Sequence, residues 1–480
     1  MEISGSNRMA PVDSGKVARV AERIIRLSLC LGWVICCNLW IPRRAAADGS
    51  PLTLQAAVSK ALQANPQVQI AVLEAGKSHD ALGEARSVYL PRFWVSSTAG
   101  YSNRWNEKLR AVDGSGQERV YGLTSLGATD GFFNVGVDQV LVDLKRWSEI
   151  GQAARGADVA RAAEAVRREQ IAAEVIQRYS EILRLEHHLA IETERQRRAM
   201  NLDTQSAAFA KVGRALPSDL ALVRLGADSA RADVQARSAD LAGAREALME
   251  TLELEVDGNA VARAPVALVE DSLPGEDRLG RLDTPTELSQ APDLRLLDFQ
   301  QQLAQETVNT AKAGRFPTVT LRGQYSNYGP KRYDNYPDEL RVGIDARLTL
   351  FDGMQTDSAI AEAQKGLAVA RLQYRSALEQ KRCTVRALTR RLAALQTSGA
   401  LATQRAQNTR EQFRLAGLHL ETGRGSLAEV ADALDGWTRT EHDAVDAHFD
   451  RVVVWATLQR EAGQLIAALD IGDAAPAESR

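Results

Sequence analysis

Few residues of this chain have the types and spacing that enzyme chemistry requires. His442 and His448 are six residues apart, with no third ligand nearby. His187 and His188 are adjacent in a predicted helix, so their side chains point in different directions. Because a zinc site needs three or four convergent ligands, neither pair predicts a metal centre.

The remaining candidates for chemistry are a cysteine and a glycine-rich step. Cys383 stands alone in a basic helical stretch, which favours a passive thiol over a nucleophile. The Gly-Arg-Gly step at 423–425 opens a helix but also follows one, so it predicts a turn and not a dinucleotide-binding loop. The sequence therefore predicts a protein that is not an enzyme, with no cofactor and no bound metal.

Two carboxylates have a more informative spacing. Glu429 and Asp432 are three residues apart near the start of a predicted helix, so they lie on one face of it. By itself such a pair is typical of a solvated helix end. What the pair could do depends on the elements that position it.

The chain contains two copies of one unit. Residues 65–91 reappear as 291–317, with both prolines of the segment repeated at an interval of 226 residues. Asp143 and Asp352 are only 209 residues apart, so the first copy has a connection 17 residues longer between its second proline and this aspartate. A duplication of this size predicts pseudo-twofold architecture within one subunit.

Each copy contains a long helical hairpin. Residues 144–211 lack proline and are rich in strong helix formers, and in the next helix Leu220, Ala227, Val234, Leu241 and Leu248 form a strict heptad. The pattern predicts helices over 144–211 and 218–252 in the first copy, and over 355–420 and 427–464 in the second. The hairpins turn at Gly213 and Gly423. Alone, they are typical of a structural bundle.

Four strands interrupt the helices. After each second proline the hydrophobic period changes to two, which predicts strands at about 93–102, 132–142, 318–328 and 340–351. This length crosses a bilayer when the strand is tilted. The strands could instead pack on the helices of a soluble domain. Four strands cannot close a barrel, so strands that meet lipid must belong to a barrel shared by several subunits, of 8, 12 or more strands.

The N-terminus has the pattern of a secretory signal peptide over 1–47. Basic residues precede an apolar run at 27–41, and three alanines supply a cleavage site before Asp48. Without this segment the chain has 52 basic and 59 acidic residues, so nucleic acid is not an expected partner. Cys383 is then the one remaining cysteine. A lipid anchor is not expected, because Ile35 and Cys36 are not the small residues that precede a lipid-anchored cysteine.

These features together resemble the outer membrane efflux protein family, the TolC-like exit ducts. The resemblance extends over about 52–465 and includes Leu-Thr-Leu-Gln-Ala-Ala-Val at 52–58, Asn65-Pro66, the duplication and the strand pairs. It implies a mainly α fold with a membrane β-barrel, in which a homotrimer shares a 12-stranded barrel continued by a periplasmic tunnel of 12 helices. It also implies outer membrane lipid, a periplasmic adaptor protein and an inner membrane transporter, of ABC type, as partners.

The resemblance gives roles to residues at the hairpin tips. In a trimer, Glu429 and Asp432 would form two rings of three carboxylates, a cation-selective entrance. Asp219 and Arg424 would be candidates for an ionic latch that holds the tips closed. The family's latch tyrosine aligns with Leu420, and its arginine aligns one residue after Arg424, so this chain departs from the family pattern.

We therefore expect an exit duct in the outer membrane of a Gram-negative bacterium. Because no acylated cysteine is expected, type I secretion of a protein such as a toxin is favoured, with multidrug or small-molecule efflux as the alternative. A periplasmic coiled-coil scaffold without a pore is the second alternative. Residues 253–290 are expected to connect the repeats at the waist of the tunnel, and 466–480 to form a mobile tail.

Overall fold

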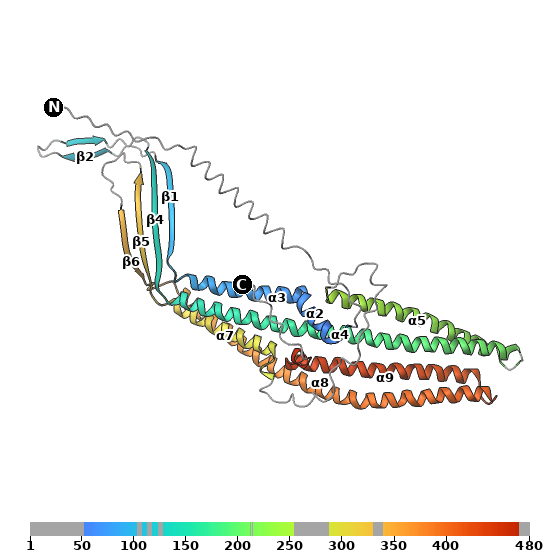
Figure 1. The fold of residues 1–480 in the computed structure, drawn as a ribbon. Helices are drawn as coiled ribbons and strands as arrows, with labels where there is room; N and C mark the ends of the chain where they lie inside the picture. The colour runs from blue at the N-terminus through green and yellow to red at the C-terminus, as the bar shows by residue number, and fades with distance from the viewer. Residues whose placement is uncertain are drawn as a thin grey trace, which may run out of the picture. The chain divides into compact units, whose positions relative to one another are not determined.

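The computed structural model of the chain is mostly helical, with a small antiparallel sheet (Figure 1). It describes residues 52–102, 108–112, 118–122, 128–211, 213, 215–253, 288–329 and 339–469. The signal peptide predicted over 1–47 and nearly all of the connection predicted over 253–290 lie outside these residues. None of the described helices is both long enough and apolar enough to cross a bilayer.

The two copies contain the same order of elements. The first consists of α3 (Pro66–Ser87), β1 (Arg92–Ser102), β4 (Ala128–Asp143), α4 (Leu144–Lys211) and α5 (Pro217–Thr251). The second consists of α7 (Pro292–Ala313), β5 (Thr318–Gly329), β6 (Glu339–Arg347), α8 (Gln355–Glu421) and α9 (Leu427–Ala462). Two short helices, α2 (Leu54–Ala64) and α10 (Leu465–Ala468), lie before the first copy and after the second.

Proline begins the first helix of each copy. Pro66 and Pro292 occupy the first turns of α3 and α7, where the missing N–H is not needed. Asn65 also caps α3, because its Oδ1 accepts a hydrogen bond from the Gln67 N–H at 2.9 Å. Its Nδ2 donates to the Thr251 carbonyl at 3.1 Å, which ties the start of α3 to the end of α5.

The sheet has the order β1-β4-β5-β6, and every pair is antiparallel. The last strand is shorter than the predicted 340–351: it ends at Arg347, and Gly353 and Met354, with φ of +68° and +70°, turn the chain into α8. A second sheet was not predicted. β2 (Lys108–Val112) and β3 (Glu118–Gly122) pair within the connection between β1 and β4, which the repeat analysis identified as the longer one.

The long helices pack as antiparallel hairpins. α4 has the predicted bounds 144–211, and it contacts α3, α5, α7 and α9. In α5, three members of the predicted heptad, Ala227, Leu241 and Leu248, are buried. α8 packs mainly against α7 and α9.

The main core lies where α2, α4, α9 and α10 meet. Tyr179 of α4 is fully buried and donates its hydroxyl hydrogen to the Leu52 carbonyl at 2.9 Å. Leu465 and Leu469 are also buried, at 0% and 2% exposure. The mobile tail predicted from residue 466 is therefore wrong for 466–469, because these leucines flank a helical turn that completes the core; residues 470–480 lie outside the described part.

Candidate functional site

Both hairpins turn at a glycine with a left-handed backbone. Gly213, between α4 and α5, has φ of +70°, and Gly423, between α8 and α9, has φ of +74°. The Arg424 N–H donates to the His419 carbonyl at 2.8 Å and the Gly423 N–H to the Leu420 carbonyl at 3.1 Å, closing the end of α8. These contacts are typical of a Schellman motif, in which glycine avoids the strain of a side chain.

The two predicted acidic residues lie on the first turns of α9, and both are exposed. Glu429 also has a local role: its N–H donates to Ser426 Oγ at 3.2 Å, and its Oε2 accepts from the Ser426 N–H at 3.1 Å. This reciprocal capping box fixes the start of the helix. Glu429 and Asp432 therefore project from a rigid helix end, and their role as charged rings stays a prediction.

The two latch candidates lie on different hairpins. Asp219 is in the first turn of α5, where its Oδ1 is 3.4 Å from Ser218 Oγ, and Arg424 is exposed after the turn of the other hairpin. The ion pairs found among the described residues do not include one between Asp219 and Arg424. A latch made by these residues would have to form between chains.

An apolar cluster joins the two hairpin tips within one chain. Leu202 of α4 and Val223 of α5 pack with Leu420 of α8 and with Leu427 and Val430 of α9. Leu420 is the position that aligns with the family's latch tyrosine, and it is 9% exposed. The sequence showed at Leu420 only a departure from the family pattern; in the structure this side chain contributes apolar contact between the hairpins.

A cation–π contact lies next to this cluster. The Arg198 guanidinium carbon is 4.9 Å from the centroid of the Phe413 ring and 4.6 Å from that of Trp437. Trp437 also donates its Nε1–H to Glu441 Oε1 at 2.8 Å. The contact joins α4 to both helices of the second hairpin. Sequence spacing gave no sign of it, because the three residues are far apart along the chain.

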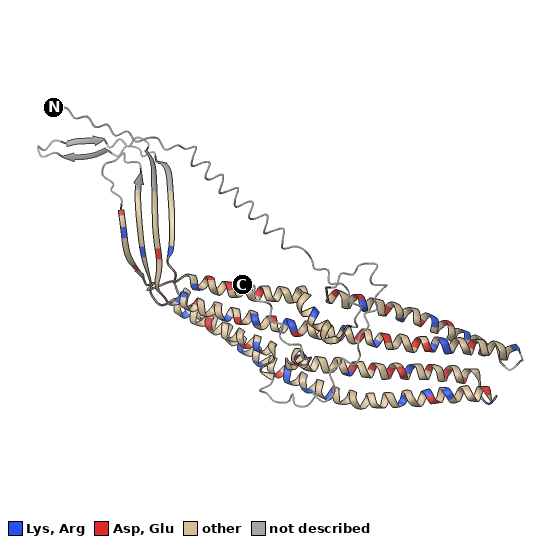
Figure 2. Cartoon of the chain, in the orientation of Figure 1, with Lys and Arg blue, Asp and Glu red and all other residues tan. Residues whose placement is uncertain are grey.

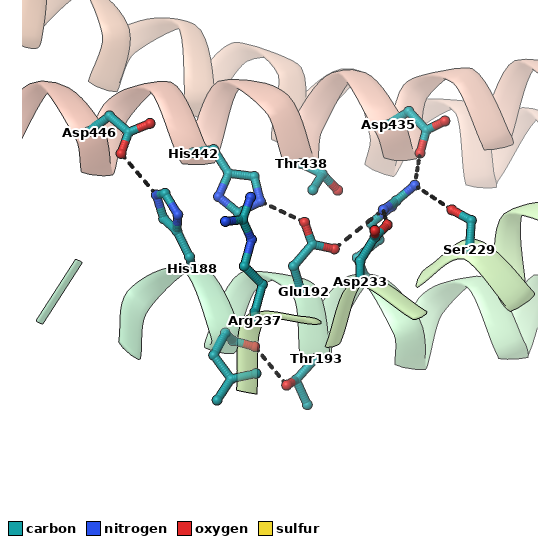
Figure 3. Close-up of polar contacts among 12 residues, drawn as sticks. His188, Glu192, Thr193, Ser229, Asp233, Arg237, Asp435, Thr438, His442 and Asp446 are labelled. Atoms are coloured by element: carbon teal, nitrogen blue, oxygen red, sulfur yellow. Dashed lines mark hydrogen bonds and ion pairs between the residues drawn. The ribbon is translucent and has the colours of Figure 1, made fainter. Parts of the chain in front are cut away.

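A row of charged and polar side chains joins α4 to α9, and we name it the α4–α9 seam (Figure 3). Its members are Arg184, His188, Glu192 and Arg195 on α4, with Asp435, His442, Asp446 and Asp450 on α9. At one end, Arg195 donates to Asp435 Oδ1 at 3.0 Å and to Asp233 Oδ2 of α5 at 2.7 Å. One guanidinium thus connects three helices.

The histidines occupy the middle of the seam. His442 Nε2 lies 2.8 Å from Glu192 Oε1, and His188 Nε2 lies 3.1 Å from Asp446 Oδ1. The His188 and His442 rings meet edge to face, with centroids 4.4 Å apart. From the sequence, these histidines were considered only as metal ligands, and the contact between His188 and His442 was not predicted. Among the described residues, no three His, Cys, Asp or Glu side chains are arranged to hold a metal ion.

Burial shifts the pKa values in the seam. Burial lowers the pKa of His188 to about 4; the nearby Asp446 carboxylate opposes this shift, and His442, Arg237 and Arg184 add to it. For Glu192, burial would raise the pKa, but the hydrogen bond from His442 and the charge of Arg195 outweigh it and lower the pKa. At neutral pH the seam therefore combines a neutral His188 with an ionised Glu192.

The four-stranded sheet has one apolar and one polar face, whereas charged residues are frequent along the helices of both hairpins (Figure 2). The strand register places on one face a set of apolar side chains that are 38% to 78% exposed: Phe93, Val95, Phe133, Val135, Tyr325, Leu340, Val342 and Ile344. The other face includes Arg92, Asp138, Arg322, Arg341 and Asp345.

The polar face is organised around Asp138. Trp94 donates its Nε1–H to Asp138 Oδ2 at 2.9 Å, and Arg322 donates its Nε–H to Asp138 Oδ1 at 3.2 Å. The indole covers Gly136, where an added Cβ would come within 2.4 Å of the ring. Three neighbouring strands are thereby joined on one surface.

The arrangement matches known proteins in sequence and in fold. Residues 285–464 match the sequence model of a family described as outer membrane efflux protein. Outer membrane protein TolC of Vibrio cholerae serotype O1 is 23% identical over 424 residues, which is 85% of this chain and 90% of that protein.

Solved structures show the same fold at lower identity. The outer membrane protein VceC of Vibrio cholerae superposes with a TM-score of 0.71 at 17% identity, over 87% of this chain and 95% of that one. The CmeC outer membrane channel of Campylobacter jejuni superposes with a TM-score of 0.70 at 16% identity, over 89% and 94% of the two chains.

We expect Leu420→Ala to separate the hairpin tips. Removing a buried leucine costs about 2–5 kcal/mol, and this one joins helices of both repeats. Limited trypsin digestion should then cleave faster at Lys211 and Arg424, beside the two turns. Leu418→Ala is the matched control, because Leu418 lies on the same helix but is 42% exposed. Equal cleavage rates for both variants would show that the apolar cluster does not hold the tips.

Proposed function

We propose that this chain is a member of the outer membrane efflux protein family and forms the outer membrane exit duct of a tripartite export system. In such a system an inner membrane transporter and a periplasmic adaptor protein deliver the substrate, and the duct passes it to the exterior. The observation that carries this proposal is the two-faced sheet.

The sheet suits a barrel shared by three chains. Its apolar face is exposed in one chain, and β1 and β6 each have a single neighbouring strand among the described residues. Three copies joined edge to edge would give 12 strands, with the apolar face toward lipid and the Asp138 face lining the passage. The helices of three copies would then form the tunnel below.

A scaffold without a pore fits this sheet poorly. Such a protein would leave a wide apolar face in water, which soluble proteins rarely do. The polar face would also have no solvent channel to line.

For the cargo, we propose type I secretion of a protein through an ABC transporter, and we keep efflux of drugs or other small molecules as the alternative. Deleting the gene separates the two: loss of a protein from the culture medium supports the first, and greater sensitivity to small toxic compounds supports the second. If neither changes, both cargo assignments are wrong.

The shared barrel predicts different effects for two neighbouring residues of β6. Ile344→Arg places a charge on the apolar face, which costs about 2–4 kcal/mol per chain at the middle of a bilayer, so we expect little oligomer in outer membrane extracts. Asp345→Arg places the same side chain on the polar face and should assemble normally. Light scattering of the purified wild-type chain should give three times the mass of one chain. A monomer with full helix and strand content would contradict the proposal.

The acidic rings predict cation selectivity. Glu429→Gln combined with Asp432→Asn removes the charges, while glutamine retains the capping contact with Ser426. In planar bilayers this variant should have a lower cation-to-anion permeability ratio and weaker block by trivalent cations, with unchanged oligomer stability. Glu84→Gln with Asp80→Asn on α3 is the matched control. Wild-type selectivity and block in the tip variant would place the entrance elsewhere.

The proposed ionic latch of Asp219 and Arg424 predicts a gate that forms between neighbouring chains. If Asp219 of one chain pairs with Arg424 of the next, replacing either with Ala should raise the single-channel conductance, since exposed pairs contribute only about 0.2–1 kcal/mol and a few of them hold the closed state. The exchange Asp219→Arg with Arg424→Asp should return the conductance toward the wild-type level. If the single variants conduct like the wild type, these residues do not form the gate.

A further inference from the structure

Four of the chain's six histidines lie on α4 and α9, where the first repeat packs against the second. His188 and His442 belong to the α4–α9 seam. His187 and His448 both lie against the Phe449 ring, with centroid distances of 5.7 and 5.1 Å. Histidine is thus concentrated in one part of the interface between α4 and α9.

The seam is regular. Arg184 lies 3.7 Å from Asp450, His188 pairs with Asp446, and Glu192 pairs with His442. Each step of four residues along α4 is matched by a step of four residues back along α9, as expected for antiparallel helices. Two successive rungs of this ladder therefore depend on a histidine, one from each helix.

The geometry suits neutral histidines. A carboxylate only accepts hydrogen bonds, so His442 must donate its Nε2–H to Glu192, and its Nδ1 is buried without a hydrogen-bond partner. His188 Nε2 is buried too, and although it is close to Asp446 it lacks the alignment of a hydrogen bond.

We propose that the α4–α9 seam is a pH-sensitive clasp, which holds the two hairpins together at neutral pH and releases α9 from α4 when His188 takes up a proton. Nothing in this proposal requires a pore.

The charges around His188 set the direction of the response. Arg184 on its own helix, Arg237 on α5 and His442 on α9 all disfavour a positive ring, and Asp446 alone favours it. Because burial and these groups lower the pKa of His188 in the packed state, its contribution to the seam is fully present above about pH 6.5. That contribution is lost as the pH falls from 6.5 toward 4.

The Arg195 end of the seam does not follow pH in this range. Its guanidinium remains charged, and it retains Asp233 on α5 and Asp435 on α9 as partners. Release should therefore begin at the histidine rungs and leave the end nearer the tips attached. The seam therefore opens at its histidine rungs and stays closed at its Arg195 end.

Dipolar electron paramagnetic resonance on the full chain in detergent tests the clasp. Spin labels at Thr193→Cys of α4 and Arg439→Cys of α9, both exposed positions, would be placed in a Cys383→Ser background and diluted with unlabelled chains. Between pH 7.5 and 5 the equilibrium should move roughly 30-fold toward separated helices, and reversibly, for a group whose pKa changes from 6.5 when released to about 4 when packed.

Three variants, together with a control at His79, test whether His188 is the sensor. His188→Gln should remove most of the response, whereas His79→Gln, at an exposed histidine of α3, should retain it. Arg237→Gln should move the midpoint of release to lower pH, because it raises the pKa of His188 in the packed state and so weakens the drive toward release; Asp446→Asn lowers that pKa and should move the midpoint to higher pH. A purely structural role for these residues would not give shifts of opposite sign, so the charge variants remain decisive if His188→Gln fails to fold.

An unchanged distance between pH 7.5 and 5 in the wild type would overturn the clasp, as would a full response in His188→Gln. Conductance is a separate readout that rests on the proposed duct. Release of the seam at pH 5 without a pore in bilayers would contradict the duct and leave the clasp supported.

Discussion

The two edges of the four-stranded sheet constrain the rest of this molecule. Each unpaired backbone N–H or C=O costs several kcal/mol in hydrocarbon, so an open sheet with an apolar face is stable in a membrane only when other strands complete it. The same constraint applies to the helices, because they are continuous with the strands. β4 continues into α4 without a break, and the Tyr89 hydroxyl donates to the Asp143 carbonyl at 2.6 Å at that junction. If several chains close a barrel, their number also sets the number of helices that continue it.

The contact between the two hairpins changes along their length. Near the turns it is apolar, with Leu420 in the tip cluster and Arg198 between two aromatic rings. Further along, the α4–α9 seam adds buried His188 and Glu192 to apolar contacts, while its aspartates are 43% to 55% exposed. Buried charge pairs are a poor source of net stability, because removing charges from water offsets much of their attraction. The apolar neighbours of the seam, such as Leu183 and Phe449, therefore contribute much of the stability of this part of the interface.

The sequence predicted what local periodicity determines. The bounds of α4 follow from an unbroken run of helix formers, and the alternation after Pro317 marked β5 to within about a residue. It failed where the outcome depends on distant contacts. Leu465 and Leu469 fold against the core although the composition around them resembles a tail. The alternation beyond Arg347 continues in sequence, but the strand ends there, and a left-handed turn at residues 353 and 354 leads into α8.

The candidate site shows the same division. The turn glycines and the acidic face of α9 could be found from spacing, because each lies within one element. The His188–His442 contact could not, since it depends on the register between two helices that are about 250 residues apart along the chain. The apolar role of Leu420 could not be found for a related reason: its alignment with a polar residue of the family says nothing about which apolar neighbours this chain places around it.

The duplicated halves are not equivalent in their surroundings, and this asymmetry bears on assembly. α4 is surrounded by α3, α5, α7 and α9, whereas α8, its counterpart, packs mainly on α7 and α9 and leaves Val369, Leu372 and Leu401 about half exposed. The sheet is asymmetric in the same sense, with a strand of the first repeat at one edge and a strand of the second at the other. An edge that differs from its opposite joins head to tail, and head-to-tail contacts form either a closed ring or an open filament. In a curved sheet lying in a membrane, the closed ring is the arrangement that leaves no strand edge in lipid.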